Sequence, residues 1–252
     1  MRNYVDLNVL LVDDEVAILE LLKYLFTERG ARVTTAADGR VALEQLQLQA
    51  FDIVISDFRM PRLNGITLLE TLRNNAEGHD DPAVILVSGY QYLQNDQALD
   101  KGASALLNKP LEHGHLLELA RRYATPRGER WVPQLDAKTP KENLKLELTS
   151  VDRLIQEGRF NLGKGGFFVQ VDNPFLEAGE LVTLDIQFAG GSIPSIQGVG
   201  QVRWVRTEDS SLAFGGYGVE ILSVTDECRD RLVAFIEQHP TKSFIPLGSR
   251  AA

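Results

Sequence analysis

Short apolar runs alternate with amphipathic segments along the first half of the chain. Asn8–Val12 (NVLLV) is almost continuously apolar, which is typical of a strand buried on both faces of a parallel sheet. From Ile18 to Phe26, apolar residues recur with helical spacing, and Gly30 ends this pattern. The cycle repeats with strands at 32–35, 53–56, 83–87 and 105–107 and helices beginning near Asp38, Asn64, Asp96 and His115. This order predicts an α/β domain, a (βα)5 doubly wound sheet, over residues 1–124.

The pattern changes after residue 124. Residues 125–140 are mostly polar and contain three prolines, so they predict a linker, with Trp131 docked on one domain. Beyond it, apolar residues fall at every second position in 144–148, 182–188 and 199–205, between glycine-rich turns. A helix is expected from about Asp226, with Cys228 on its apolar face. Residues 141–239 thus predict a small antiparallel β-barrel or sandwich with a C-terminal helix, followed by a mobile tail over 240–252.

Composition and charge narrow the functional classes. The 252 residues include 26 Lys and Arg against 35 Asp and Glu, a net charge of −9, which argues against DNA binding. One cysteine excludes an intramolecular disulfide and favours the reducing cytoplasm. No apolar run approaches the roughly 20 residues of a membrane helix, and acidic residues come too early for a signal peptide. We therefore expect a cytoplasmic protein with neither membrane insertion nor export by that route.

Charged and polar side chains follow four of the predicted parallel strands. Asp13 and Asp14 follow the first, Asp57 follows the third, Ser88 the fourth and Lys109 the fifth. The carboxyl ends of parallel strands meet at one edge, where three carboxylates repel one another unless a divalent cation neutralises them. Carboxylates with room for water suit Mg²⁺, and a hydroxyl with an ammonium suits a phosphoryl group. Taken singly, each aspartate fits a helix cap and the lysine a solvated charge, but the set favours a phosphoryl-transfer site.

These motifs resemble those of a two-component response-regulator receiver domain over residues 8–123. The resemblance rests on the Asp13-Asp14 pair, the D-x-x-M-P-x-x-x-G run from Asp57 to Gly65, the Ser88-Gly89 step and Lys109-Pro110. It implies a phosphoacceptor, not an enzyme with a separate substrate, which receives its phosphoryl group from a histidine kinase, a phosphotransfer protein or a small phospho-donor.

The same resemblance assigns roles to individual residues. Asp57 would be the phosphoacceptor. Asp14, Asp57 and the backbone carbonyl of Arg59 would bind Mg²⁺ directly, and Asp13 would bind it through water. Lys109 would pair with the phosphoryl oxygens, and Ser88 would be the switch hydroxyl.

Two further features concern how a signal would leave this domain. The family usually has an aromatic residue three positions before the lysine, whereas this chain has Leu106. The family also suggests a homodimer through the face made by the fourth helix, the fifth strand and the fifth helix. The charged residues there fit a dimer surface or a solvated surface equally well; they are Asp96, Asp100, Lys101, Glu112, Arg121 and Arg122.

The second half resembles a PilZ-type domain over about residues 141–238. Such domains carry an N/D-x-S-x-x-G turn and an upstream pair of arginines, and commonly bind cyclic di-GMP. Here Asn161 and Gly166 match the turn, but Gly163 replaces the serine, and Lys141 and Lys145 stand at the arginine spacing. Because lysine lacks the planar fork that reads guanine and phosphate together, weakened nucleotide binding is expected.

Two hypotheses for the output follow. In the first, the PilZ-like domain acts by contact with an unknown downstream protein. In the alternative, it is a second sensor that binds cyclic di-GMP through Lys141, Lys145, Asn161 and Gly166. The glycines also fit simple tight turns of a barrel, which is compatible with either hypothesis.

Overall fold

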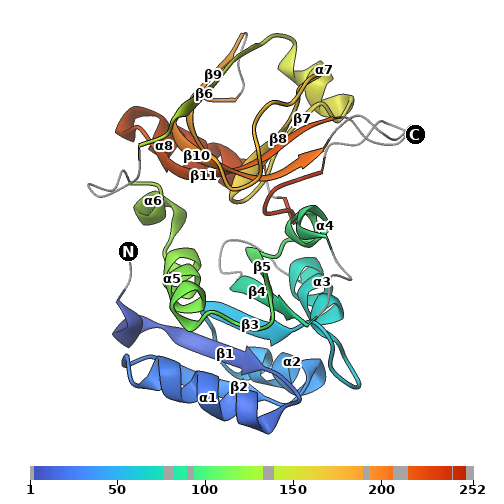
Figure 1. Cartoon of the computed structure of the whole chain (residues 1–252), viewed down its shortest axis with the longest axis vertical. Helices are drawn as coiled ribbons and strands as arrows, with labels where there is room; N and C mark the ends of the chain where they lie inside the picture. The colour runs from blue at the N-terminus through green and yellow to red at the C-terminus, as the bar shows by residue number, and fades with distance from the viewer. Residues whose placement is uncertain are drawn as a thin grey trace. The chain divides into compact units, whose positions relative to one another are not determined.

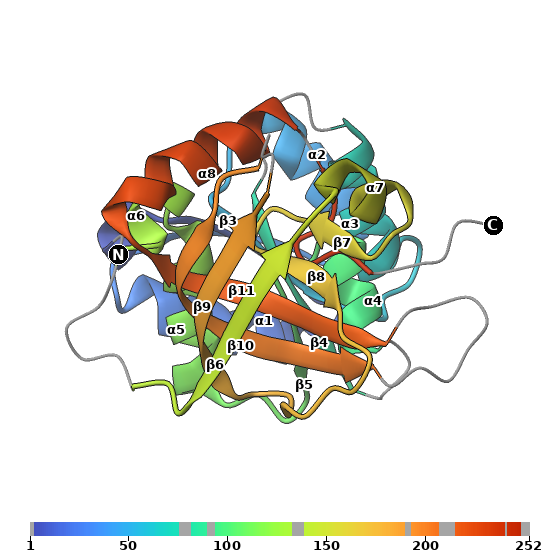
Figure 2. The ribbon, with the colours of Figure 1, turned by 90° about the horizontal axis from the view of Figure 1, so that it is seen from above.

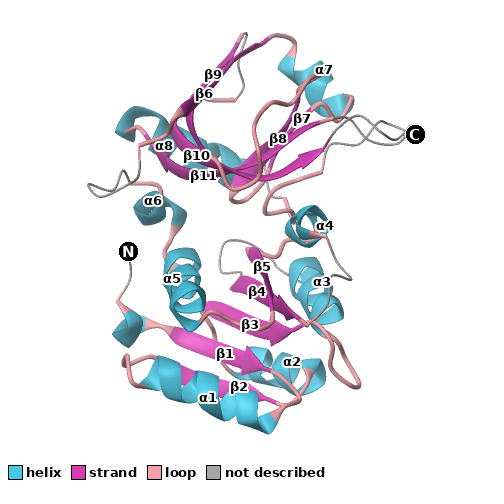
Figure 3. Cartoon of the chain, in the orientation of Figure 1, coloured by secondary structure: helices cyan, strands magenta, loops and turns pink. Residues whose placement is uncertain are grey.

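A computed structural model describes residues 3–75, 82–89, 94–132, 139–189, 193–206, 215–239 and 241–247. Its elements are shown by chain order in Figure 1 and by type in Figure 3. The chain folds into two compact units. The first unit comprises Met1–Gln94 and Lys101–Pro126, and the second comprises Asn95–Asp100 and Arg127–Ala252. None of the helices within the described ranges is long and apolar enough to cross a membrane.

The first unit is built on a five-stranded parallel sheet in the order β2-β1-β3-β4-β5. The strands are β1 (Asn8–Val12), β2 (Arg32–Ala36), β3 (Ile53–Asp57), β4 (Ala83–Ser88) and β5 (Ala105–Asn108). A short 3-10 helix, η1 (Tyr4–Asp6), precedes the sheet, and its helices are α1 (Val16–Thr27), α2 (Gly39–Leu48), α3 (Gly65–Asn75) and α5 (His113–Ala124). The predicted doubly wound fold is confirmed.

Buried side chains explain why these strands form the centre of the first unit. Residues 9–12 of β1 and all five residues of β3 are buried, as the apolar runs predict for a sheet covered on both faces. On one face, the Tyr4 ring contacts Phe26 of α1, and its hydroxyl donates to the Leu117 carbonyl of α5. Asp38 begins α2 by accepting hydrogen bonds from the amides of the first helical turn.

The second unit contains a six-stranded mixed sheet in the order β6-β9-β10-β11-β8-β7. Its strands are β6 (Glu142–Leu148), β7 (Phe160–Leu162), β8 (Gly166–Gln170), β9 (Leu181–Phe188), β10 (Ile196–Arg206) and β11 (Gly216–Val224). Its helices are α4 (Asn95–Asp100), α6 (Arg127–Arg130), α7 (Val151–Gln156) and α8 (Asp226–Gln238). Figure 2 shows these strands together with α8.

The six-stranded sheet, which curves into a half-barrel, and the C-terminal helix α8 agree with the predicted fold class. One strand pairing differs from the prediction. Four neighbouring pairs are antiparallel, but β6 pairs with β9 in parallel, with Leu144 opposite Leu184. Parallel neighbours need a long connection, and the chain between β6 and β9 supplies it with α7, β7 and β8. Alternation along β6 and β9 identifies each strand but contains no information about its direction.

The core of the second unit includes part of the segment expected to be a linker. Trp131 is fully buried in the cluster formed by the inner faces of the strands and α8, and its carbonyl accepts a hydrogen bond from the Val224 amide. Residues 133–138 of the expected linker lie outside the described residues. The tail over 240–252 was expected to be mobile. Within it, Ser243 and Phe244 instead form backbone hydrogen bonds with other segments of this unit.

The opposite face of the sheet carries a second aromatic group. The Phe168 and Trp204 rings stack 5.5 Å apart, and the Arg206 guanidinium lies 5.1 Å from the Trp204 ring centroid. Helix α4 packs against this side of β10, where Asp96 forms an ion pair with Arg206 at 2.9 Å. Strands β8 and β11, which pair with each other, are buried along nearly their whole length.

Replacing Tyr217 by Phe is expected to destabilise the second unit by about 2 kcal/mol. The buried Tyr217 hydroxyl accepts hydrogen bonds from the amides of Phe175 at 2.6 Å and Leu176 at 3.0 Å, and both amides would lose their partner. Urea unfolding followed by tryptophan fluorescence measures this unit selectively, because both tryptophans, Trp131 and Trp204, belong to it.

The control for this change is Thr183→Val, in the same unit. The Thr183 side chain on β9 is exposed, so removing its hydroxyl should leave the unfolding curve unchanged. An equally unchanged midpoint for Tyr217→Phe would show that these two amides find other partners.

Candidate functional site

The candidate site lies at the carboxyl edge of the parallel sheet, where four strands end. Asp57 is the last residue of β3, Ser88 is the last of β4, Asp13 follows β1, and Lys109 follows β5. The register aligns these ends, since Asp57 pairs with Val87 and Ser88 with Asn108. The edge predicted from the sequence is therefore formed by these strands.

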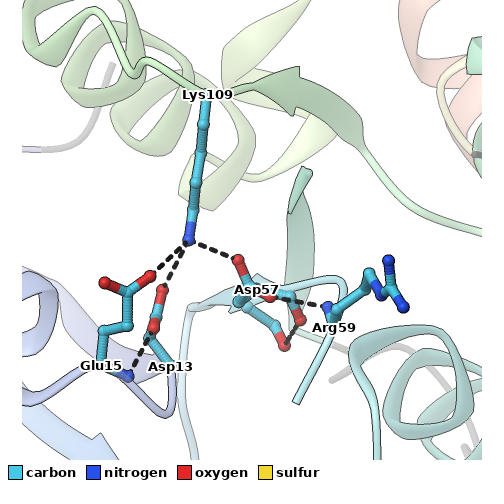
Figure 4. A network of polar contacts seen from close by, with 6 residues as sticks. Asp13, Glu15, Asp57, Arg59 and Lys109 are labelled. Atoms are coloured by element: carbon cyan, nitrogen blue, oxygen red, sulfur yellow. Dashed lines mark hydrogen bonds and ion pairs between the residues drawn. The ribbon is translucent and has the colours of Figure 1, made fainter. Parts of the chain in front are cut away.

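Lys109 joins the carboxylates of this edge (Figure 4). Its Nζ lies 2.6 Å from an Asp57 carboxylate oxygen and 3.3 Å from one of Asp13. A third carboxylate, that of Glu15, lies 3.7 Å from the same Nζ. Asp13 and Asp57 are only 4% and 7% exposed, so their charges are poorly screened by water and the ammonium offsets both.

The buried charges shift the pKa values of this network. Burial raises the pKa of the Asp13 carboxyl, and the nearby Asp57 charge adds to that rise, although the Glu15 amide and Lys109 oppose it. For Lys109, burial lowers the pKa, but the hydrogen bond to Asp57 and the charges of Asp13 and Asp57 outweigh this, so its pKa is raised. Lys109 is therefore a fixed positive charge at this edge.

The loop after β3 holds the Asp57 carboxylate from its other side. The Arg59 amide donates a 2.6 Å hydrogen bond to an Asp57 carboxylate oxygen. The loop then returns closely past the strand end, because the Gly65 amide bonds to the Phe58 carbonyl. A Cβ on Gly65 would lie 2.2 Å from the Asp57 carbonyl oxygen, which gives the last glycine of the D-x-x-M-P-x-x-x-G run a structural reason.

An open depression of about 410 Å³ adjoins this loop. Its lining residues are Asp14, Phe58, Arg59, Met60, Pro61 and Asn64. In the described part of the chain, no three carboxylate, histidine or cysteine side chains are gathered into a ready-made metal site. The oxygen donors of this edge nevertheless suit Mg²⁺ chemically, and the depression beside Asp14 leaves room for the waters that Mg²⁺ retains.

Ser88 and Leu106 lie on neighbouring strands of the same sheet. Ser88 is 2% exposed, and its carbonyl accepts a hydrogen bond from the Lys109 amide at 2.8 Å. Leu106 pairs with Leu86 of β4 and is half-buried. An aliphatic side chain therefore occupies the position where the resemblance implies an aromatic one.

Glu15 belongs to the network but was not a candidate from the sequence. Besides its carboxylate near Lys109, its amide donates to an Asp13 carboxylate oxygen at 2.8 Å. The only sequence signal is its place directly after the Asp13-Asp14 pair, before the first residue of α1.

In the second unit, the four nucleotide-binding candidates fall at the two ends of the strand order. Lys141 immediately precedes β6, and Lys145 on β6 lies 3.9 Å from Asp185 of the adjoining strand. Asn161 on β7 and Gly166 on β8 are at the other end of the strand order. The two lysines therefore lie at or beside the edge strand β6. The Asn161–Gly166 turn connects β7 and β8, at the opposite end of the strand order.

Several residues of the expected dimer face have partners within the chain. Asp96 pairs with Arg206, and the Asp100 carboxylate accepts hydrogen bonds from the Ser243 hydroxyl and the Leu247 amide. Lys101 forms an ion pair with Glu70. These charges are therefore not simply solvated.

Family models match both halves of the chain. The model described as a response regulator receiver domain matches residues 9–121, and the model described as a PilZ domain matches residues 140–238. The chain is 35% identical over 126 residues to the transcriptional regulatory protein CpxR of Escherichia coli, covering 50% of this chain and 52% of CpxR. It is 31% identical over 111 residues to DltR of Streptococcus agalactiae, covering 44% of this chain and 49% of DltR. The chain spans about half the length of these two relatives.

Among solved structures, the chain is similar to the Francisella response regulator 1452 receiver domain. The identity is 30% and the TM-score 0.44, with 47% of this chain and 97% of that chain covered. A CheX–CheY–BeF₃–Mg complex from Borrelia burgdorferi shows 31% identity and a TM-score of 0.44, with 48% and 90% covered. From its sequence motifs and these family matches, the chain consists of a response regulator receiver domain over residues 9–121 followed by a PilZ domain over residues 140–238.

Proposed function

We propose that this chain is a phosphorelay response regulator that is phosphorylated on Asp57. The observation that supports it best is the contact of the Lys109 ammonium with both buried carboxylates, Asp57 and Asp13, at the carboxyl edge of the sheet. A fixed positive charge beside the acceptor carboxylate offsets charge on incoming phosphoryl oxygens.

The transfer follows from the chemistry of these groups. One Asp57 carboxylate oxygen attacks the phosphorus of a phosphohistidine, forming an O–P bond. The P–N bond breaks, and its electron pair stays on the imidazole nitrogen, which takes up a proton. Lys109 remains beside the new acyl phosphate and pairs with its oxygens.

Mg²⁺ would be held by Asp14, Asp57 and the Arg59 carbonyl, with Asp13 acting through water. When bound, it supplies further neutralisation of the phosphoryl oxygens. The Arg59 amide already orients the Asp57 carboxylate through its hydrogen bond, which leaves the other carboxylate oxygen to Lys109. Ser88, at the end of the adjoining strand, is the hydroxyl that responds to the phosphoryl group.

We propose further that the PilZ domain passes the signal on by contact with another protein. Support comes from the weakened nucleotide determinants. Gly163 offers no hydroxyl, Lys145 lies 3.9 Å from Asp185, and the Asn161 amide group is 3.5 Å from the Leu247 carbonyl. The alternative function, in which cyclic di-GMP is a second input, is favoured by the match to a PilZ domain.

Calorimetric titration of cyclic di-GMP distinguishes these two outputs. We expect no heat of binding to the full chain, either alone or with beryllofluoride and Mg²⁺ as a mimic of phosphorylation. Micromolar or tighter binding in either state would overturn the protein-contact proposal. In that case Asn161→Ala should weaken nucleotide binding. Unchanged binding by Asn161→Ala would mean that the nucleotide binds at another site.

A further inference from the structure

The segment Ser243–Leu247 lies along the Asn161–Gly166 turn of the PilZ domain. The Lys164 amide donates a 2.9 Å hydrogen bond to the Ser243 carbonyl, and the Gly165 amide donates one of the same length to the Phe244 carbonyl. Both donors and both acceptors belong to the backbone. Contacts of this kind recognise an extended peptide irrespective of its side chains.

Two side chains of the segment fix its position. Phe244 is 5% exposed, and Ile245 is completely buried. The Arg130 guanidinium lies 6.0 Å from the centroid of the Phe244 ring. The segment is therefore anchored by an aromatic residue followed by an aliphatic one, and it forms no part of a helix or strand.

The glycines of the turn are explained by this segment. A Cβ on Gly163 would lie 2.6 Å from the Phe244 carbonyl oxygen, and a Cβ on Gly165 would lie 2.1 Å from the Phe244 ring. Neither glycine has a positive φ, in contrast to Gly158 and Gly179. The backbone of the turn does not itself need glycine at these positions, whereas the close approach of the segment does.

Helix α4, in the same unit, holds the segment from its other side. The Phe244 amide donates to the Leu99 carbonyl at 2.8 Å. The Asp100 carboxylate accepts from the Ser243 hydroxyl at 3.1 Å and from the Leu247 amide at 3.0 Å. Each backbone polar group of Phe244 thus has a partner, one in the turn and one in α4.

We propose that the Asn161–Gly166 turn is a binding site for an extended peptide, and that Ser243–Leu247 occupies it in cis. The ligand class is a peptide with an aromatic residue followed by an aliphatic residue. This inference rests on the proposed output by protein contact and names the surface involved. Any partner peptide at this site must displace the segment, and so must a nucleotide held by the same turn.

A labelled peptide with the sequence of residues 241–247, TKSFIPL, tests the proposal by fluorescence anisotropy. The full wild-type chain should not bind it, because the tethered segment has a far higher effective concentration. The full chain with Phe244→Asp should bind it saturably, since the cis segment has lost its anchor. A peptide carrying the same Phe-to-Asp change should bind neither chain.

Two further variants keep the outcome decisive. Phe244→Ala removes the aromatic anchor of the cis segment without adding a charge and leaves the turn and Asp100 intact, so this chain should also bind the peptide. Gly165→Ala, added to either released chain, should block the peptide through its Cβ. If Phe244→Asp stays folded and does not bind the peptide, the proposal is wrong. If Phe244→Asp unfolds, absence of peptide binding to a folded Phe244→Ala chain has the same meaning.

These outcomes are separable from the proposed function. Phosphoryl labelling of Asp57 can be measured on the same protein samples. If Asp57 is labelled but the folded Phe244→Asp chain does not bind the peptide, only the peptide-site proposal is overturned. If that chain binds the peptide but Asp57 is not labelled, only the phosphorelay proposal is overturned.

Discussion

Replacing Asp57 by Asn is expected to abolish phosphorylation of this protein. The amide keeps the size of the side chain but lacks the anionic oxygen that attacks phosphorus, and its NH₂ group offers the Lys109 ammonium no charge to pair with. Incubation with a small phospho-donor and Mg²⁺, followed by intact-mass measurement, should show one added phosphoryl group on the wild type and none on the variant. Beryllofluoride should likewise cause no spectroscopic change in the variant.

The matched control is Asp52→Asn, at the opposite end of the same strand. Asp52 directly precedes β3, and its carboxylate accepts a hydrogen bond from the Asn8 amide at 2.8 Å. An asparagine oxygen can accept that bond too, so labelling should match the wild type. Labelling that persists in Asp57→Asn and maps to another carboxylate would refute the assignment of the phosphoacceptor.

The first fold could be predicted from sequence because its signals are local. A strand buried on both faces must be apolar throughout, so β1 and β3 are recognisable without knowledge of their neighbours. Parallel order then brings Asp13, Asp57 and Lys109 to one edge. The role of Glu15 could not be predicted, because any of the acids after β1 could turn towards the lysine.

The second fold was predicted in class but only partly in detail. Alternation identifies β6, β9 and β10, but not β8 and β11, which are buried along nearly their whole length and so show no alternation of buried and exposed residues. The parallel pairing of β6 with β9 depends on the path of the intervening chain, which leaves no periodic signal.

The glycine turn shows a more general limit of sequence reasoning. Gly163 departs from the serine of the family motif, which by itself indicates only a missing hydroxyl. Its other explanation lies about eighty residues away along the chain, where the Phe244 carbonyl approaches within 2.6 Å of its would-be Cβ. Such a contact joins two segments that have no shared pattern, so only the structure shows it.

Replacing Gly166 by Ala is expected to destabilise the second unit by about 3 kcal/mol, the upper part of the range for overpacking. Gly166 begins β8 and lies opposite Glu220 of β11. A Cβ there would lie 2.0 Å from the Val219 carbonyl oxygen and 2.9 Å from the Glu220 Cα, which are backbone atoms that cannot rotate away. Urea unfolding followed by tryptophan fluorescence should therefore give a clearly lower midpoint.

Gly128→Ala is the matched control, because Gly128 is exposed in α6 and has no atom within 4 Å of an added Cβ. Its midpoint should be unchanged or slightly raised, since alanine favours the helix. The comparison also separates two explanations of Gly166. A large loss of stability without any nucleotide means that close strand pairing alone requires this glycine. A wild-type midpoint for Gly166→Ala would mean that the strands accommodate a Cβ, and that the requirement for glycine comes from a ligand at the turn.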